Sequence, residues 1–379
     1  MKLSTDDLGL FFDPRHHQLA AELRRVAPAI AEASVGEGAD ARVAAAMGEA
    51  GLYGWLLPAG GAADVRALCL VREMLGQVSP AGDAIFAVQG LGSYPVLLAG
   101  TDAQKQVLLD RFRSGQLIGA FALTEPEAGS DVASLATAAR RDGDGWVLDG
   151  RKTLISNVGI AGSYVVFANA DPAAGRKGIT AFVVPADAPG LREVAIELSV
   201  DHPLGGLELD GCRVGADALL GAVGGGFALA MQTLDTFRVS VGAAAAGMAR
   251  RALDEATARV SARVQFGKPL AAQQLVQAHL ADMATELDAA RLLVLRAAHL
   301  KDSGAERVTT EAAMAKLYAT EAAQRIIDAA VQLHGGLGVT SGAVVENLYR
   351  AIRPLRIYEG TSEIQRIIIG RAVAKGADK

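Results

Sequence analysis

The stretch VQAHLADMATELDAARLLVLRA, residues 276–297, decides the architecture of the C-terminal part of the chain. Its apolar and small residues recur at alternating spacings of four and three, which places them on one face of a long helix. Alanines in such a seam let neighbouring helices approach closely, so we expect this helix to pack lengthwise in a bundle. The seam consists of Val276, Leu280, Met283, Leu287, Ala290, Val294 and Ala297.

A second long helix is expected to follow. Thr309 or Thr310 is predicted to cap its start, with Glu311 favourable near the positive end of the helix dipole. The helix should run to about Leu333, where Gly335 and its neighbour stop it. Residues 223–379 are therefore predicted to form a C-terminal four-helix bundle.

The segment before the bundle has a different composition. Residues 119–222 are rich in valine, threonine, phenylalanine and glycine, and apolar, β-branched runs lie close together without intervening helices. Expected strands cover 121–124, 136–141, 146–148, 164–169 and 179–185, with a hairpin turn at 142–145. We predict an antiparallel, barrel-like β-domain here. Residues 1–118 are alanine- and leucine-rich with helical spacing, so the fold class is α+β with an N-terminal helical domain.

The overall composition excludes several classes of protein. The 379 residues are 51% hydrophobic and 21% charged, which fits two or three well-packed units. A net charge of −5 gives no general attraction to nucleic acid. Cys69 and Cys212 form neither a disulfide framework nor a zinc-binding pair, and no apolar run reaches the roughly 20 residues of a membrane span. Because the N-terminal residues lack a signal-peptide core, we expect a soluble, cytoplasmic protein. We also expect no metal site.

Two segments in the middle block contain groups suited to a ligand. FALTEPEAGSD (121–131) leads from a strand into a turn, where Thr124 and Ser130 offer hydroxyl groups. Such a loop suits a phosphate or the polar edge of a flat heterocycle, although taken alone the pattern favours an ordinary strand-to-loop turn. In RKTLISN (151–157), Leu154 and Ser156 point to the same face of a strand, which is also what any half-buried strand would show.

Two further segments lie in the helical C-terminal part. In RVQFGKPL (263–270), Arg263 could hold a diphosphate and Phe266 could stack on a ring, or the segment could be a solvated helix connector. In LRIYEGTSEIQR (355–366), Glu359 lies between an apolar pair and Gly360. A carboxylate in an apolar wall makes a reasonable general base, although a lone glutamate is more often a cap or an ion-pair partner.

Taken together, these segments resemble the acyl-CoA dehydrogenase family in order and spacing over nearly the whole chain. The resemblance is strongest in LTEPEAGSD (123–131), KTLISN (152–157), QFGKPL (265–270), QLHGG (332–336) and IYEGTSEIQR (357–366). It implies the three domains expected above, and FAD bound between the β-domain and the bundle with its adenosine end reaching a neighbouring subunit. It also implies a homotetramer built as a dimer of dimers.

The resemblance further implies roles for individual residues. On the flavin side the segment 121–130 would contribute Phe121, Leu123, Thr124, Gly129 and Ser130, together with Leu154 and Ser156. The diphosphate and adenosine would be held by Arg263, Gln265, Phe266, Gln274, Gln332 and Gly336, and Thr361 and Glu363 would complete the FAD site. Ser130, Asp235, Arg238 and Gly360 match substrate contacts.

The implied reaction is oxidation of an acyl-CoA thioester to the trans-2-enoyl-CoA. Glu359 would remove the α-proton while hydride passes to flavin N5, and electrons would then leave to an electron-transfer flavoprotein. The backbone N–H of Glu359 and a flavin hydroxyl would stabilise the enolate oxygen. Some family members carry the base at another position, but Phe237 stands there and cannot accept a proton. The resemblance thus makes Glu359 the catalytic residue.

Other interpretations lie close to this one. The enzyme could act on acyl groups bound to a carrier protein, or the chain could be a non-catalytic FAD- or acyl-CoA-binding subunit. Leu154 stands where many relatives carry tryptophan, which affects the flavin's surroundings. Gly90 and Gly92 match a region that borders the acyl pocket in relatives, and their lack of side chains suggests room for a branched or cyclic acyl group.

Overall fold

The computed structural model describes residues 1–60, 63–200 and 202–376 of the chain. The chain folds into two compact units. The first combines residues 1–31, 64–83 and 238–379, and the second combines 32–63 and 84–237. Since each unit is assembled from separate segments, the predicted domain boundaries at 118/119 and 222/223 stay predictions.

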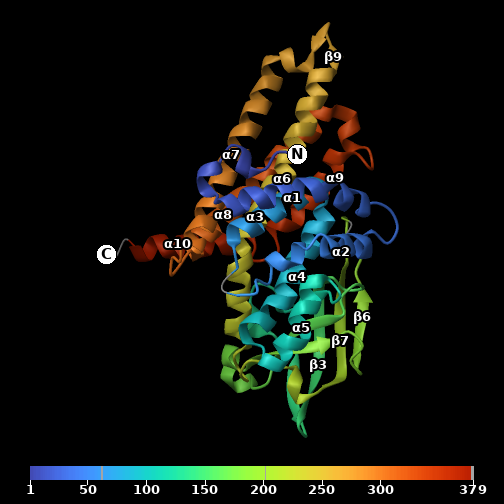
Figure 1. Cartoon of the computed structure of the whole chain (residues 1–379), viewed down its shortest axis with the longest axis vertical. Helices are drawn as coiled ribbons and strands as arrows, with labels where there is room; N and C mark the ends of the chain where they lie inside the picture. The colour runs from blue at the N-terminus through green and yellow to red at the C-terminus, as the bar shows by residue number, and fades with distance from the viewer. Residues whose placement is uncertain (61–62, 201, 377–379) are drawn as a thin grey trace. The chain divides into compact units, whose positions relative to one another are not determined.

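The first unit is helical (Figure 1). Its main members are α1 (Pro14–Ala33), α3 (Val65–Val78), α7 (Gln274–Asp302), α8 (Thr309–His334), α9 (Val344–Ile352) and α10 (Ser362–Gly376), with most of the long α6 (Gly226–Ala262). Three of these helices meet at Gly242 of α6, where a Cβ would lie 2.7 Å from Val294 of α7 and 3.3 Å from the Ala315 carbonyl oxygen of α8. The bundle is therefore packed at distances that only small residues permit.

The seam of α7 is buried over part of its length. Met283 and Leu287, like the later seam residues, are buried, whereas Val276 and Leu280 near the start of the helix are only half-buried. The first turns of α7 adjoin the short hairpin of β9 (Val264–Gln265) and β10 (Lys268–Pro269), which joins α6 to α7 at the far end of both helices (Figure 1). Within the single chain, this end of the predicted seam thus lacks full cover.

The ends of α8 differ in how well the sequence predicted them. The helix begins at Thr309, and Val308 occupies the capping position without a side-chain hydrogen bond, so the predicted threonine cap is wrong. The end is confirmed, because the helix ends at His334 and Gly335 takes a positive φ of 63°. The signal at the end of the helix is a glycine, which favours the positive φ that the chain takes there. The predicted threonine cap at the start has no such link to the backbone conformation.

The second unit contains the sheet. Eight strands follow the order β6-β7-β3-β2-β4-β5-β8, with β1 beside β4. The hairpin predicted at 142–145 is confirmed, because Asp142 of β2 pairs with Gly145 of β3. Neighbours are antiparallel except that β4 pairs in parallel with β1 and, at one position, with β2. The strands are β1 (Gly119–Ala122), β2 (Ala138–Asp142), β3 (Gly145–Ser156), β4 (Ser163–Asn169), β5 (Ile179–Pro185), β6 (Leu191–Ala195), β7 (Leu204–Val214) and β8 (Leu219–Leu220).

Helices in this unit anchor the start of the sheet. They are α2 (Ala39–Glu49), most of α4 (Pro80–Ala99) and α5 (Asp102–Ser114). Gln89 of α4 donates to the carbonyl oxygens of Phe112 and Leu117 (2.9 and 3.0 Å) and accepts from Gly119 N (2.7 Å). One buried amide therefore fixes α5 and β1 together, and it leaves no polar group of its own unpaired at this point.

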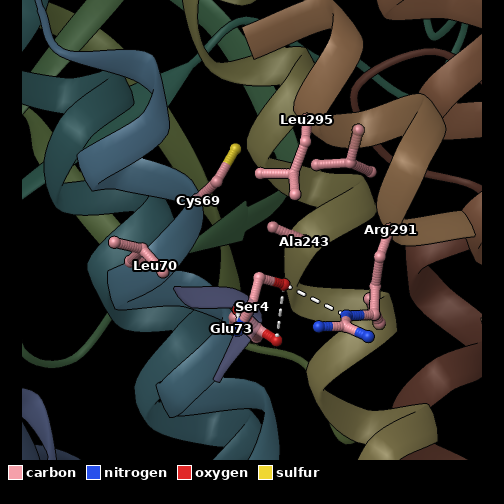
Figure 2. A pocket seen from close by; sticks show the side chains of 9 residues that line it. Ser4, Cys69, Leu70, Glu73, Ala243, Arg291 and Leu295 are labelled. Atoms are coloured by element: carbon pink, nitrogen blue, oxygen red, sulfur yellow. Dashed lines mark hydrogen bonds between the residues drawn. The ribbon is translucent and has the colours of Figure 1, made fainter. Parts of the chain in front are cut away.

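A polar cluster in the first unit holds the N-terminal segment (Figure 2). Ser4 donates from its backbone N–H and its hydroxyl to the two oxygens of Glu73 (3.0 Å each), and its hydroxyl accepts from Arg291 Nε (3.1 Å). Burial raises the pKa of Glu73, and Arg291 opposes that rise. Cys69 also lines a cavity beside the cluster. The cavity has a volume of about 10 Å³, which leaves room for no more than a water molecule.

Arg291→Met should destabilise the protein by about 3–5 kcal/mol, because it removes the main cation that opposes the burial of the Glu73 carboxylate and breaks the ion pair with Asp7. Chemical denaturation measures the loss. The double variant Glu73→Gln, Arg291→Met should recover part of it, since the glutamine no longer needs a cation. Wild-type stability in the single variant would show that the cluster does not support the fold.

Candidate active site

Glu359 lies in a tight turn between a short 3-10 helix, Arg353–Arg356, and helix α10. Glu359 and Gly360 have successive positive φ angles of 52° and 89°. For a residue with a Cβ this conformation costs roughly 1–2 kcal/mol, so it persists only where surrounding contacts enforce it. Strain at an acidic residue marks this turn as a candidate functional element.

Two side chains fix the backbone of the turn. Gln365 Nε2 donates to the carbonyl oxygens of Glu359 (3.3 Å) and Gly360 (2.9 Å). Lys316 Nζ of α8 donates to the same Gly360 oxygen at 2.7 Å. A Cβ on residue 360 would lie 2.7 Å from Gln365 Nε2, so glycine is needed both for the positive φ and for this close approach.

The electrostatic surroundings of Glu359 pull in opposite directions. Burial is the largest influence and raises the pKa of Glu359, and Asp83 raises it further. Arg72, Arg238 and Lys316 oppose the rise. Among the described residues, no group forms a hydrogen bond with the buried Oε2 of Glu359. A carboxylate with a raised pKa and an oxygen without a hydrogen-bond partner is suited to accept a proton.

Arg72 and Asp83 were not expected from the sequence. Asp83 is fully buried, and its two oxygens accept from Arg72 Nε (2.8 Å) and Nη2 (2.9 Å), while Arg72 Nη1 donates to Ser240 Oγ (3.0 Å). Arg72 is therefore already bonded to a carboxylate and acts on Glu359 through its field alone. Charged residues among the many apolar residues of the 65–78 helix were the signal that could have indicated a buried ion pair.

A second candidate surface lies on β3 in the second unit. Between Lys152 and Ile155 the pairing of β3 with β7 shifts by one residue, so Thr153 and Leu154 together face one residue of β7. Leu154 has a positive φ of 55° and remains 55% exposed. Bulges of this kind redirect side chains, and they are frequent beside active sites. An apolar side chain held outward by strained backbone fits a surface that a flat ring would cover.

The loop 123–131 is attached to this bulge. Thr153 N donates to the Thr124 oxygen (3.0 Å), and the carboxylate of Glu125 accepts from Lys152 Nζ at 2.7 Å. Glu125 also accepts from the backbone N–H groups of Ala136 (2.6 Å) and Thr137 (3.0 Å). A buried ion pair between Glu125 and Lys152 thus links the motif 121–131 to β3. The sequence did not predict this ion pair. Gly129 and Ser130 at its tip are exposed.

His202 is a further residue that sequence reasoning missed. Its Nε2 lies 2.7 Å from Ser156 Oγ, two residues beyond Leu154. Burial lowers the pKa of His202 to about 4, so the imidazole is neutral near pH 7. A neutral imidazole can accept the hydroxyl proton of Ser156 or donate to its oxygen. Nothing in the local sequence other than a histidine in an apolar, proline-containing stretch indicated this contact.

The predicted diphosphate and adenosine residues lie on two exposed elements of the first unit. Arg263 and Gln265 belong to the hairpin between α6 and α7, whose Phe266 is 94% exposed with a positive φ of 52°. Gln274 is exposed at the start of α7, and Gln332 lies with Gly336 at the exposed end of α8. An almost fully exposed phenylalanine on a strained hairpin is typical of a surface that meets a ligand or another chain.

The remaining predicted residues have varied surroundings. Thr361 Oγ1 accepts from Ile364 N (3.3 Å) at the start of α10, where Glu363 is exposed. Asp235 is half-buried on α6, and Arg238 is buried. The ring of Phe237 packs edge-on against Tyr94, with centroids 5.4 Å apart.

The room suggested beside Gly90 and Gly92 is already filled. A Cβ on Gly90 would lie 2.8 Å from Phe237 and 2.9 Å from Leu56, and one on Gly92 would lie 2.5 Å from Ala120 N. These glycines permit close packing of α4, and the expectation that they open space for a branched or cyclic acyl group is wrong.

Comparisons with known proteins identify the family. The chain matches the acyl-CoA dehydrogenase N-terminal, middle and C-terminal domains over residues 16–116, 120–212 and 224–374. It belongs to the acyl-CoA dehydrogenase family. It is 43% identical to the short-chain specific acyl-CoA dehydrogenase of Bos taurus over 87% of this chain and 81% of that protein. It is 40% identical to the 3-(aryl)acrylate reductase of Clostridium sporogenes over 87% and 89%.

A solved structure extends the comparison to the cofactor. The glutaryl-CoA dehydrogenase of Mycobacterium smegmatis in complex with FADH2 is 29% identical and superposes with a TM-score of 0.89 over 98% of both chains. Members of the family use FAD. The residues present here fit that group, because the β3 bulge presents an exposed Leu154 with the Ser156 hydroxyl on the same strand. In the part of the chain that the structure describes, no cluster of metal-binding side chains occurs and no helix is long and apolar enough to cross a membrane.

The stability of the wild-type protein should fall as the pH is lowered from 6.5 towards 4, in part because the unfolded chain binds a proton at His202 that the folded protein excludes. The contribution is up to about 3 kcal/mol. Urea denaturation across this interval should show a smaller loss for His202→Asn, which cannot titrate. Identical profiles for wild type and His202→Asn would contradict the assignment.

Proposed function

We propose that this chain oxidises an acyl-CoA thioester to the trans-2-enoyl-CoA, with Glu359 as the base that removes the α-proton. The observation that carries the proposal is the turn at 358–361. Its half-buried acidic residue has a strained backbone and a buried carboxylate oxygen without a hydrogen-bond partner. A structural glutamate has no need of this combination, whereas a base that must meet a carbon acid in an apolar site does.

The turn accounts for both halves of the enolisation. When the Cα–H bond breaks, the proton passes to the Glu359 carboxylate and charge develops on the thioester oxygen. No acceptor for the backbone N–H of Glu359 occurs among the described residues, so this N–H remains free to donate to that oxygen. FAD, when bound, supplies the acceptor for the two electrons and the β-hydrogen. The protein's task is to align the acyl chain and to stabilise the developing charge.

We further propose how the chain holds its cofactor and substrate. The resemblance in sequence supports the substrate contacts at Ser130, Asp235, Arg238 and Gly360. The exposed hairpin at 263–268 supports a cofactor contact that extends to a second copy of the chain, and with it a homotetramer. Reduced flavin would pass electrons to an electron-transfer flavoprotein. The FAD contacts proposed are Phe121, Leu123, Thr124, Gly129, Ser130, Leu154, Ser156, Arg263, Gln265, Phe266, Gln274, Gln332, Gly336, Thr361 and Glu363.

A second candidate is the reverse reaction, reduction of an α,β-unsaturated acyl compound. The relative from Clostridium sporogenes is named a 3-(aryl)acrylate reductase, and the raised pKa of Glu359 suits a group that donates a proton as well as one that accepts it. Mixing reduced holoenzyme with an enoyl-CoA, and oxidised holoenzyme with an acyl-CoA, measures both directions. The panel should begin with short acyl groups, because the bovine relative is short-chain specific.

Carrier-protein substrates and a non-catalytic role are tested by the same panel. A carrier-protein enzyme would reduce its flavin only with acyl groups on the carrier. A non-catalytic subunit would bind FAD or acyl-CoA and leave the flavin oxidised with every substrate.

Glu359→Gln should bind FAD normally but slow the bleaching of the flavin by substrate. The variant keeps size and hydrogen-bonding capacity but removes the proton acceptor, so the loss should reach or exceed the 10²–10⁴-fold that is typical of general-base catalysis, an order-of-magnitude expectation. Stopped-flow absorbance measures this step alone. Glu306→Gln, an exposed residue in the loop before α8, should behave as wild type. Near-normal bleaching by Glu359→Gln would refute the proposed function.

Arg263→Ala should weaken FAD retention and oligomer stability together, because a cofactor held across two chains links the two equilibria. Gel filtration with flavin absorbance, at several protein concentrations, measures both quantities. Arg307→Ala removes an equally exposed arginine outside the hairpin and should change neither. Full FAD occupancy in an unchanged oligomer would count against the cross-chain contact.

A further inference from the structure

Lys316 is a charged residue in an unusual position. It lies in the interior of α8, its side chain is fully buried, and its ammonium group donates to the Gly360 carbonyl oxygen at 2.7 Å. Among the described residues, no carboxylate forms an ion pair with it and no other acceptor is found. Its one bond therefore goes to the residue that follows Glu359 in the strained turn.

A buried lysine at this point carries an electrostatic cost. Burial lowers the pKa of Lys316 to about 8, with Arg238 acting in the same direction, and the fields of Glu359, Glu321 and Glu363 only partly oppose this. A buried ammonium without a paired carboxylate costs free energy, and an apolar residue of similar volume is usually tolerated at least as well. The Gly360 oxygen would still accept from Gln365.

Lys316 is one of four charged groups that act on Glu359 from the elements around it. Arg72 comes from α3, Asp83 from the start of α4, and Arg238 from α6. Arg72 and Asp83 are bonded to each other, and they act on the pKa of Glu359 in opposite directions. Lys316 differs from them because it is also attached directly to the turn that carries the base.

We propose that Lys316 is a positioning residue for catalysis, which holds the base turn in place through Gly360 and keeps the Glu359 carboxylate ionised at the pH where the enzyme works. The inference rests on the proposed role of Glu359. Two effects are combined in one side chain: the hydrogen bond fixes the backbone of the turn, and the positive charge favours the reactive form of the base.

Gln365 provides the matched control, because it donates to the same carbonyl oxygen without a charge. Lys316→Met removes one hydrogen bond to Gly360 and shortens the side chain by one atom. Gln365→Met keeps side-chain length and removes the hydrogen bonds to Gly360 and Glu359. Only the first removes a charge. The rate of flavin reduction by substrate should be measured by stopped flow across the pH range for both holoenzymes, for Lys316→Arg and for wild type.

The variants should separate as follows. In Lys316→Met the acid limb of the profile should move to higher pH, and each unit of movement should lower the rate on the acid side about tenfold, because the ionised fraction of the base falls by that factor. Gln365→Met should lower the rate by one factor that is the same at every pH, and the acid limb of its profile should stay at the wild-type pH. Lys316→Arg, which keeps the charge, should retain the wild-type limb.

A stability measurement gives a readout that does not depend on activity. The folded protein disfavours the charged form of Lys316, so this cost is present below about pH 8 and disappears as the pH rises towards 10.5, the ordinary pKa of lysine. Lys316→Met should therefore be at least as stable as wild type below pH 8, and its advantage should shrink between these two values. Denaturation of the FAD-bound protein at several pH values measures the difference.

Several outcomes would overturn the proposal. An acid limb in Lys316→Met that coincides with wild type would show that the charge does not act on the base. An equal movement of the limb in Gln365→Met would assign the effect to the geometry of the turn alone. Loss of stability in Lys316→Met at neutral pH would make Lys316 a structural residue. The proposed function fails separately, if Glu359→Gln still bleaches its flavin at a near-normal rate.

Discussion

A carboxylate that is buried and must still ionise is the constraint on which this site depends. Burial in the bundle disfavours the charged form of Glu359, and removal of a proton from carbon requires that form. The helices around the turn place cations from α3, α6 and α8 near Glu359, and these cations lower its pKa. An aspartate near the turn limits their effect. The strained backbone adds a second requirement, which the bonds from Gln365 and Lys316 to the turn satisfy.

Two buried lysines illustrate different uses of the same side chain. Lys152 in the sheet and Lys316 in the bundle both have a pKa lowered to about 8 by burial. Lys152 bonds directly to the Glu125 carboxylate, and the pair fixes the loop 123–131 from behind. Lys316 bonds to a backbone oxygen and leaves the nearby Glu359 carboxylate uncommitted. A glutamate in a direct ion pair supports the structure, whereas a glutamate without one can accept a proton.

Small residues determine how closely the elements approach. Gly242 allows three helices of the bundle to meet, and Gly90 and Gly92 let α4 lie against Phe237 and the first strand. In each case a neighbour occupies the place of the absent side chain at close-packed distance, so these three glycines mark contact rather than space. The same reasoning shows why residue type alone is poor evidence for the shape of a substrate pocket.

The sequence by itself determined the order of helical and sheet segments, the family, the end of α8 and the position of the candidate base, because periodicity, glycine and a continuous motif are local properties. It did not determine the start of α8, the parallel pairing at β4 or the buried extent of the α7 seam, since these depend on neighbouring elements. Nor could it reveal that Arg72, Asp83 and Lys316 surround Glu359, or that His202 meets Ser156. Those groups come from segments far apart in the chain, and only tertiary packing brings them close together. Burial then lowers the effective dielectric constant between them, so each charge acts more strongly on its neighbours.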